Sequence, residues 1–335
     1  MKVALHFSTP FSLVHGGAQV QIEQTKAALE AIGVDIEYLR WWDASQKCDL
    51  IHSFERLTPG FISFAQKKGV KVLIAPLLTG LGSRPRHILF VQRFVTSLGR
   101  KILPGMLKAP FGWDSFSHAD GCVALTPWEA HLMRYVFKAP SERVHVVPNG
   151  VEEAFFKAAP TPRGQWLVCT ATITERKRVL ELAKAAISAQ TPVWIVGKPY
   201  SDSDPYAQRF VALARAYPKI IRYDGPVQDR NQMAEVYREA RGFVLLSTME
   251  SLSLSALEAA ACECPLLLSD LPWARTTFGE NSTYCPMASA GSTGKVLRQF
   301  YDAAPGLPPP PKPLTWIEVA LQFKKVYERL LSTSR

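Results

Sequence analysis

The chain has 335 residues, of which 47% are hydrophobic and 20% charged, and its net charge is +10. This composition is typical of a globular protein of about two domains and excludes a disordered chain, and no apolar run reaches the roughly 18 residues of a membrane-spanning helix. The start, MKVALHFSTP, lacks the apolar core of a signal peptide. We therefore expect a cytoplasmic protein whose first strand lies at its N-terminus.

Short runs rich in Val, Ile and Leu alternate with helical patterns through the first half of the chain. Helical apolar spacing predicts helices over 19–33 and 127–137. Strands are predicted at 3–7, 34–39, 50–54, 70–76, 121–126 and 143–148. His52, inside the third of these runs, is expected to pack rather than to react.

The positive charge is concentrated in one part of this first half. From Arg56 to Trp113 there is no Asp or Glu, whereas the same stretch holds ten Lys and Arg residues, so the rest of the chain sums to zero. Within it, residues 84–111 interleave basic with apolar side chains, a pattern typical of a membrane surface or anionic ligand site. The alternatives are a solvated basic face and a helix whose apolar stripe packs in the core. Nucleic acid is not expected, because no binding motif accompanies the charge.

The second half repeats the alternation of strands and helices. Strands are predicted at 165–172, 192–197, 220–226, 242–248 and 265–270, and helices at 177–189, 204–218, 232–240 and 255–263. Proline and glycine near 151–164 indicate a domain boundary. Residues 306–313, GLPPPPKP, are predicted to form a stiff linker before a C-terminal amphipathic helix.

Alternation of this kind predicts parallel sheets covered by helices, and it occurs twice. The expected fold class is α/β, with two doubly wound Rossmann-like domains facing a central cleft. We place an N-terminal domain at 1–152, a second domain at 153–312 and a closing helix at 313–335. Ligands are expected at the carboxyl ends of the strands.

The segment TMESLSLSALEAAACECP places Glu250 and Glu258 on either side of a Ser/Leu-rich turn. A strand ending at Thr248 and a helix starting near Ser251 would put Glu258 about two turns into that helix. The amides of 251–254 would then suit a phosphate. In the simpler alternative, Glu250 is a charge at a helix N-terminus and Glu258 a solvated helix position.

The six cysteines are scattered and form no CxxC pair and no metal-binding spacing with histidine. We read them as buried, reduced thiols. No DxD-like aspartate pair occurs in a suitable loop either, so no metal is expected.

Several short motifs together resemble those of retaining GT-B glycosyltransferases of the group 1, or family 4, type. They are HGGAQ at 15–19, VVPNGVE at 146–152, TERKR at 174–178, WIVGKP at 194–199, YDGPV at 223–227 and MESLSLSALEAAACECP at 249–265. The resemblance covers nearly the whole chain. It implies that the closing helix crosses back onto the N-terminal domain.

The resemblance implies transfer of a sugar from a nucleotide-diphosphate sugar, a UDP- or GDP-sugar, with retention of configuration and no cofactor. Glu250 and Lys177 become the catalytic candidates, since Glu250 would meet the donor sugar and Lys177 the diphosphate. The donor-binding candidates are Gly16, Gly17, Arg176, Gly197, Gly225, Pro226, Val227, Ser251, Leu252, Ser253, Leu254 and Glu258. Glu258 would accept hydrogen bonds from the ribose.

Three departures from the family pattern stand out. Pro76 and Leu77 occupy the place of a family histidine, which leaves His15 and His87 as candidates for contact with acceptor or sugar. Thr172 replaces an arginine near the donor phosphates, for which Arg176 would compensate. Glu263 replaces a glycine, with a tightened turn or an altered donor preference as the expected effects.

The family also implies partners and a location. The expected acceptor is a glycan or a lipid-linked sugar in surface polysaccharide or glycoconjugate assembly. Contact with an anionic membrane through residues 84–111 would place the protein at the inner face of the membrane. The alternatives are a nucleotide-binding protein of GT-B fold without transferase activity and a nucleotide-sugar epimerase.

Overall fold

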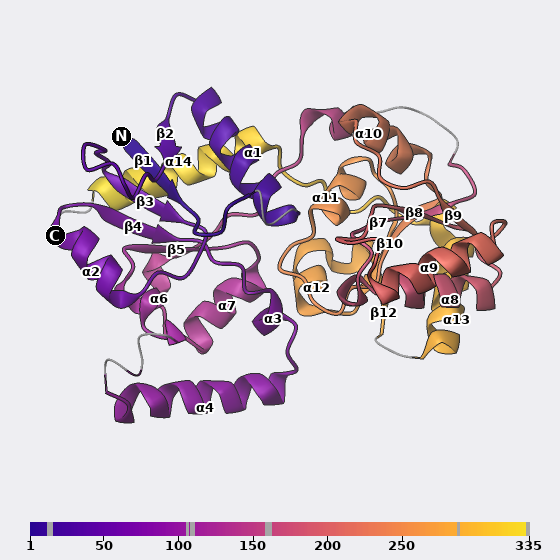
Figure 1. Cartoon of the computed structure of the whole chain (residues 1–335), viewed down its shortest axis with the longest axis horizontal. Coiled ribbons are helices and arrows are strands. Elements are labelled where there is room, and N and C mark those ends of the chain that lie inside the picture. Colours follow the sequence, from indigo (N-terminus) through magenta and orange to yellow (C-terminus); the bar gives the residue numbers. More distant parts are fainter. Residues whose placement is uncertain (12–15, 105–106, 108–110, 158–162, 287–288, 333–335) are drawn as a thin grey trace. The chain divides into compact units, whose positions relative to one another are not determined.

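The computed structural model describes residues 1–11, 16–104, 107, 111–157, 163–286 and 289–332. The chain divides into two compact units (Figure 1), one comprising 1–150 with 314–335 and the other 151–313. Each unit is built on a parallel sheet of six strands, with its helices around that sheet. The α/β fold class expected from the alternation of strands and helices is confirmed.

Unit 1, defined as residues 1–150 and 314–335, has the strand order β2-β1-β3-β4-β5-β6. Its strands are β1 (Lys2–His6), β2 (Asp35–Tyr38), β3 (Leu50–Ser53), β4 (Lys71–Ile74), β5 (Gly121–Ala124) and β6 (Val144–Val146). Each was predicted from its apolar run. Strands β3 and β5 are buried along their whole length, as expected of central strands in a sheet covered on both faces.

The helices of unit 1 follow the strands in alternation. They are α1 (Gly17–Ala31), α2 (Pro59–Lys67), α3 (Thr79–Gly82), α4 (Arg86–Ile102), α6 (Ser115–His118), α7 (Pro127–Tyr135) and α14 (Trp316–Ser332). Thr58 and Thr126 cap α2 and α7, and each precedes a proline at the first helical turn. Helix α2 was not predicted, because the Pro59–Gly60 pair at its start is typical of a turn.

The C-terminal helix α14 packs against α1 and onto the sheet of unit 1. Close approach to its first residue depends on Gly150, since a Cβ there would lie 2.6 Å from the backbone of Trp316. At the other end of the helix, the Tyr327 hydroxyl lies 2.8 Å from Nδ1 of His52 on β3. His52 is fully buried between Phe54 and Phe323, which confirms that it packs.

Acidification is expected to loosen α14 from the sheet. Burial lowers the pKa of His52 to about 3 in the folded unit. Below the unfolded pKa of about 6.5, the unfolded chain therefore binds a proton at His52 that the folded unit does not bind. The stability of unit 1 is therefore full above about pH 6.5 and falls by about 2 kcal/mol between pH 7 and pH 5. Hydrogen exchange of the β3 amides at both pH values measures this change. His52→Gln should flatten the dependence, and an equal slope in the variant contradicts the assignment.

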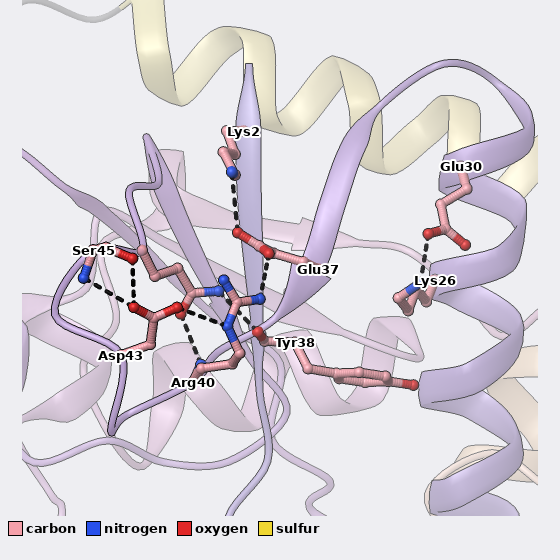
Figure 2. Close-up of polar contacts among 9 residues, drawn as sticks. Lys2, Lys26, Glu30, Glu37, Tyr38, Arg40, Asp43 and Ser45 are labelled. Carbon is pink, nitrogen blue, oxygen red and sulfur yellow. Dashed lines mark hydrogen bonds and ion pairs between the residues drawn. The ribbon is translucent and has the colours of Figure 1, made fainter.

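An ion-pair network fixes the loop after β2 (Figure 2). Arg40 Nε lies 3.0 Å from Asp43 Oδ2, and the Arg40 guanidinium also pairs with Glu37, which Lys2 meets from β1 at 3.2 Å. Hydrogen bonds from Arg40 and its neighbours lower the pKa of Glu37 to about 2. These ion pairs connect the loop to β1 and β2, and the loop carries two exposed indoles, Trp41 and Trp42.

Unit 2, defined as residues 151–313, has the strand order β12-β11-β10-β7-β8-β9. Its strands are β7 (Leu167–Thr170), β8 (Val193–Val196), β9 (Ile221–Tyr223), β10 (Gly242–Leu245), β11 (Leu266–Ser269) and β12 (Thr283–Cys285). With the strands of this unit numbered 1 to 6 along the chain, the order is 6-5-4-1-2-3, which is the strand order of dinucleotide-binding domains. The order in which successive strands are added to the sheet reverses between β7 and β10. The edge strand β12 was missed, because its three residues make no apolar run.

The helices of unit 2 cover both faces of this sheet. They are α8 (Val179–Ser188), α9 (Pro205–Ala216), α10 (Arg230–Glu239), α11 (Leu254–Ala261), α12 (Pro272–Phe278) and α13 (Ala290–Ala303). Helices α8, α9 and α13 contribute to one apolar core with β7 and β8, around Phe210 and Phe300. Five cysteines are buried and the sixth half-buried, and all are free thiols.

Candidate functional site

The candidate site lies at the reversal point of the unit 2 sheet. Strands β7 and β10 are neighbours there, paired through Leu167 and Gly242. The chain leaves both strands at the same edge, because they are parallel. Residues 171–178 follow β7 and residues 246–253 follow β10. Ligands of doubly wound sheets bind at this edge.

Arg176 joins the two loops. Its carbonyl accepts from the Thr248 amide at 2.8 Å, and its Nη1 donates to the Met249 carbonyl at 3.0 Å and to Glu250 Oε1 at 3.1 Å. A short 3₁₀ turn, η4 (Glu175–Lys177), carries this arginine, and the Thr174 hydroxyl caps it by accepting from the Lys177 amide. The geometry of the loop after β10 therefore depends on Arg176.

The Lys177 ammonium forms an ion pair with the same oxygen of Glu250. Both side chains are nearly buried, at 12% and 9% exposure, while Arg176 is more open at 39%. One carboxylate thus faces two cations at the carboxyl edge of a sheet. This arrangement contradicts the simpler alternative of a helix-end charge, because Glu250 precedes the first residue of α11 by four positions.

Helix α11 begins three residues after the start near Ser251 that was considered for the Glu250 segment, and one residue before the predicted range 255–263. Strand β10 ends at Leu245 and the helix starts at Leu254, not near Ser251. Ser253 is its N-cap and accepts from the Ala256 amide at 3.4 Å. Ser251 and Leu252 therefore lie in the turn before the helix, since the chain needs more residues to reach from the sheet edge to the helix. Only the amides at and after Ser253 belong to the first helical turn.

Glu258 lies about one turn into α11, rather than two, and it is buried instead of solvated. Its carboxylate pairs with Arg230 at the start of α10 and accepts from the Tyr237 hydroxyl at 3.1 Å. Burial raises the pKa of Glu258, and the Arg230 guanidinium opposes that rise. Burial and the neighbouring Glu258 raise the pKa of Tyr237 far above its usual range, so this hydroxyl remains a donor.

Arg230 and Tyr237 were not among the site residues predicted from the sequence. Arg230 also pairs with Glu152 at 2.9 Å and stacks over the Phe155 ring, 4.7 Å from its centroid. The Tyr237 hydroxyl also forms a hydrogen bond with the Thr170 hydroxyl at the end of β7, at 2.6 Å. Their spacing of seven residues places both on one face of α10, but the predicted helix, 232–240, did not include Arg230.

Two glycines bring the loops after β8 and β9 together. The Gly197 amide donates to the Gly225 carbonyl at 3.2 Å, and both residues have positive φ, +149° and +86°. A Cβ at Gly197 would lie only 2.0 Å from the Ala171 carbonyl oxygen. Pro226 is exposed and Val227 half-buried just beyond. These residues lie at the same sheet edge as Lys177.

Gly197→Ala is expected to destabilise unit 2 by about 3 kcal/mol, because the new methyl group collides with backbone in a conformation that side chains rarely adopt. Gly306→Ala is the matched control, since no atom lies within 4 Å of its Cβ position. Urea unfolding of both variants measures the difference. Equal midpoints would contradict the close approach at Ala171.

The remaining predicted site residues belong to unit 1. Gly16, with φ +138°, is the N-cap of α1, and Gly17 is the first residue of that helix. His15 lies outside the described residues. His87 is exposed in the first turn of α4.

The departures from the family pattern have visible structural consequences. Glu263 follows the C-terminus of α11 with φ +55°, the left-handed conformation for which glycine is the usual residue. The glycine of the pattern therefore matches a helix end. At Pro76–Leu77, the following amide of Leu78 donates to the buried Glu129, 3.1 Å away, and Glu129 also accepts from the Leu125 amide. Glu129 fixes the loops after β4 and β5, and its burial was not predicted.

Among the described residues there is no group of three or more His, Cys, Asp or Glu side chains that could hold a metal. No helix in the described part of the chain is both long and apolar enough to cross a membrane.

Comparison with known proteins identifies the second unit. Residues 164–301 match the family described as "Glycosyl transferases group 1", which confirms the resemblance over this part of the chain. A D-inositol 3-phosphate glycosyltransferase from Acidothermus cellulolyticus is 25% identical over 211 residues, which are 55% of this chain and 47% of that one. The chain spans about half the length of the curated relatives it matches.

Solved structures extend the likeness in fold to both units. Sucrose-phosphate synthase from Thermosynechococcus elongatus superposes with a TM-score of 0.67 over 99% of this chain and 100% of its own, at 18% identity. Anabaena HepE in complex with UDP gives a TM-score of 0.66 over 98% and 100%, at 12% identity. The fold is that of GT-B glycosyltransferases.

Proposed function

We propose that this chain, whose second unit is a glycosyl transferases group 1 domain, is a retaining glycosyltransferase that uses a nucleotide-diphosphate sugar. The observation that carries the proposal is the meeting of Lys177, Arg176 and Glu250 at the reversal point of the unit 2 sheet. Two cations and one carboxylate at that edge suit a diphosphate and the hydroxyls of a sugar.

In the proposed reaction, the bond between the anomeric carbon and the diphosphate breaks, and an acceptor hydroxyl oxygen bonds to the same carbon on the same face. Negative charge develops on the leaving diphosphate, which takes up the proton of the acceptor hydroxyl. The Lys177 ammonium, nearly buried, stabilises that charge more strongly than a solvated lysine would. Arg176 adds a second positive charge and takes the place of the arginine that Thr172 replaces. Glu250 orients Lys177 and accepts hydrogen bonds from the donor sugar.

The nucleoside of the donor is proposed to lie over the other strand ends of unit 2. Glu258 accepts from the ribose hydroxyls, for which its oxygens have lone pairs beyond those used by Arg230 and Tyr237. The base lies against Gly197 and 225–227. The amides of 251–254 approach the sugar and diphosphate. A UDP- or GDP-sugar is the proposed donor, and HepE, a protein of similar fold, was solved with UDP and with UDP-glucose.

Unit 1 is proposed to bind the acceptor, a glycan or a lipid-linked sugar of surface polysaccharide or glycoconjugate assembly. Its Gly16 and Gly17, at the start of α1, are proposed to approach the diphosphate. Trp41 and Trp42 support a glycan acceptor, because exposed indoles at the carboxyl edge of a sheet offer flat apolar faces to sugar rings. We place the protein in the cytoplasm, in peripheral contact with an anionic membrane through residues 84–111.

The proposal is tested with purified protein, a panel of UDP-, GDP- and ADP-sugars and lipid-linked acceptors. Transfer with retained configuration supports it. The proposal is overturned if the protein neither binds nor turns over any of these donors. A rise in melting temperature with UDP but no transfer would instead indicate a binding protein. Release of an altered nucleotide sugar without acceptor would indicate an epimerase.

A further inference from the structure

Helix α4 presents its apolar side away from the body of unit 1. In Figure 1, helix α4 lies at the outer edge of that unit, apart from the sheet. A stripe of residues spaced by four, Phe90, Phe94, Leu98 and Ile102, is exposed, with Phe90 at 64%, Phe94 at 63% and Ile102 at 68%. Val91 and Val95 beside this stripe are exposed as well. We call these six residues the α4 apolar face.

The opposite side of α4 attaches the helix to the unit through Leu89, which is buried in the apolar core, and through several polar contacts. Arg100 Nε pairs with Asp114 at 2.8 Å, and its Nη2 donates to the carbonyl of Phe137 at 2.6 Å. Arg93 stacks over the Tyr135 ring at 4.4 Å, and Thr96 is buried. Polar residues therefore take part in holding this helix, whereas an ordinary amphipathic helix turns most of its polar residues to water.

This orientation excludes one alternative left open by the sequence, a stripe packed in the core. An exposed apolar face of six large side chains on one helix exceeds the scattered apolar residues of ordinary surfaces and indicates a partner.

Charge identifies the partner. The segment from Arg56 to Trp113 contains no acidic residue, and Arg86 and Lys101 are exposed at the two ends of the helix. Apolar side chains flanked by cations on one exposed helix match the boundary of an anionic bilayer, where the chains reach the acyl region and the cations meet headgroups.

We propose that α4 lies in the surface of an anionic membrane with its apolar face inserted. The inference deepens the proposed membrane contact by assigning it to insertion of this face rather than to charge alone, and it does not depend on the proposed chemistry.

Flotation with vesicles of phosphatidylcholine alone, and of equal parts phosphatidylcholine and phosphatidylglycerol, tests the proposal. We expect binding to the anionic vesicles. Phe90→Ser/Phe94→Ser should weaken that binding about tenfold or more, because two inserted rings are lost. The matched control, Ile317→Ser/Leu321→Ser, changes two exposed apolar residues of α14 in the same unit and should bind as the wild type does.

Three results would overturn the proposal: no binding of the wild type to anionic vesicles, equal binding by the Phe90→Ser/Phe94→Ser variant, and equal loss in the α14 control. A wild-type dimer in sedimentation velocity that the Phe90→Ser/Phe94→Ser variant converts to monomer, without vesicle binding, would assign the face to a second copy. Melting with UDP, measured on the same samples without vesicles, reports separately on the donor site, so failure of one proposal is distinguishable from failure of the other.

Discussion

Glu250→Gln is expected to lower kcat by about 10²- to 10³-fold. Glutamine has nearly the same shape as glutamate but carries no charge, so Lys177 and Arg176 lose the carboxylate that positions both of them. The amide also loses the acceptor strength that the donor sugar requires. Initial rates at saturating donor and acceptor measure the loss, and circular dichroism confirms that unit 2 remains folded.

Glu239→Gln is the control for this substitution, because Glu239 is an exposed glutamate at the end of α10 whose side chain forms no hydrogen bond or ion pair with the residues that the structure describes. Its rate should equal that of the wild type. If Glu250→Gln kept full activity, Glu250 would be a structural partner of Lys177 and Arg176 only, and the catalytic role would pass to another group.

Most strands were predictable, whereas the boundaries at the site were not. The eleven predicted runs correspond to β1 through β11. Inner strands such as β5 and β10 are apolar because both of their faces are buried, whereas the edge strands β2 and β9 keep exposed polar residues. Two starts were considered for α11, near Ser251 and at residue 255, since SLSLS satisfies helical and turn patterns equally well, and the observed start is Leu254. The start of α11 depends on the distance in space between the end of β10 and the helix, and the local sequence does not determine that distance.

The candidate site shows the same limit. Lys177 and Glu250 were assigned from motifs separated by more than seventy positions, but their direct ion pair follows from the neighbouring positions of β7 and β10 in the sheet. Arg230 and Tyr237 were missed for the same reason, because only the fold brings α10 beside α11. Glu250 and Glu258 come from one motif, but they form ion pairs with different partners, so neither is the proton partner of the other.

Lys177→Ala is expected to lower kcat by about 10²- to 10³-fold as well, because an uncompensated charge on the leaving diphosphate raises the barrier. Lys184→Ala is the matched control, since Lys184 is an exposed lysine on α8 in the same unit. The loss should be smaller for donors with better leaving groups, a dependence that a purely structural lysine would not produce. An unchanged kcat with every donor would remove Lys177 from the reaction.

The double variant Glu250→Gln/Lys177→Ala separates two roles for the pair. If Glu250 acts chiefly by holding Lys177, the second substitution adds little to the effect of the first. The kcat of the double variant is then close to that of the more impaired single variant. If Glu250 acts chiefly on the donor sugar, the two losses multiply to about 10⁴-fold or more. We expect the first result, because both cations near Glu250 approach the same oxygen, Oε1. Fully multiplicative losses would contradict it and assign Glu250 mainly to sugar binding.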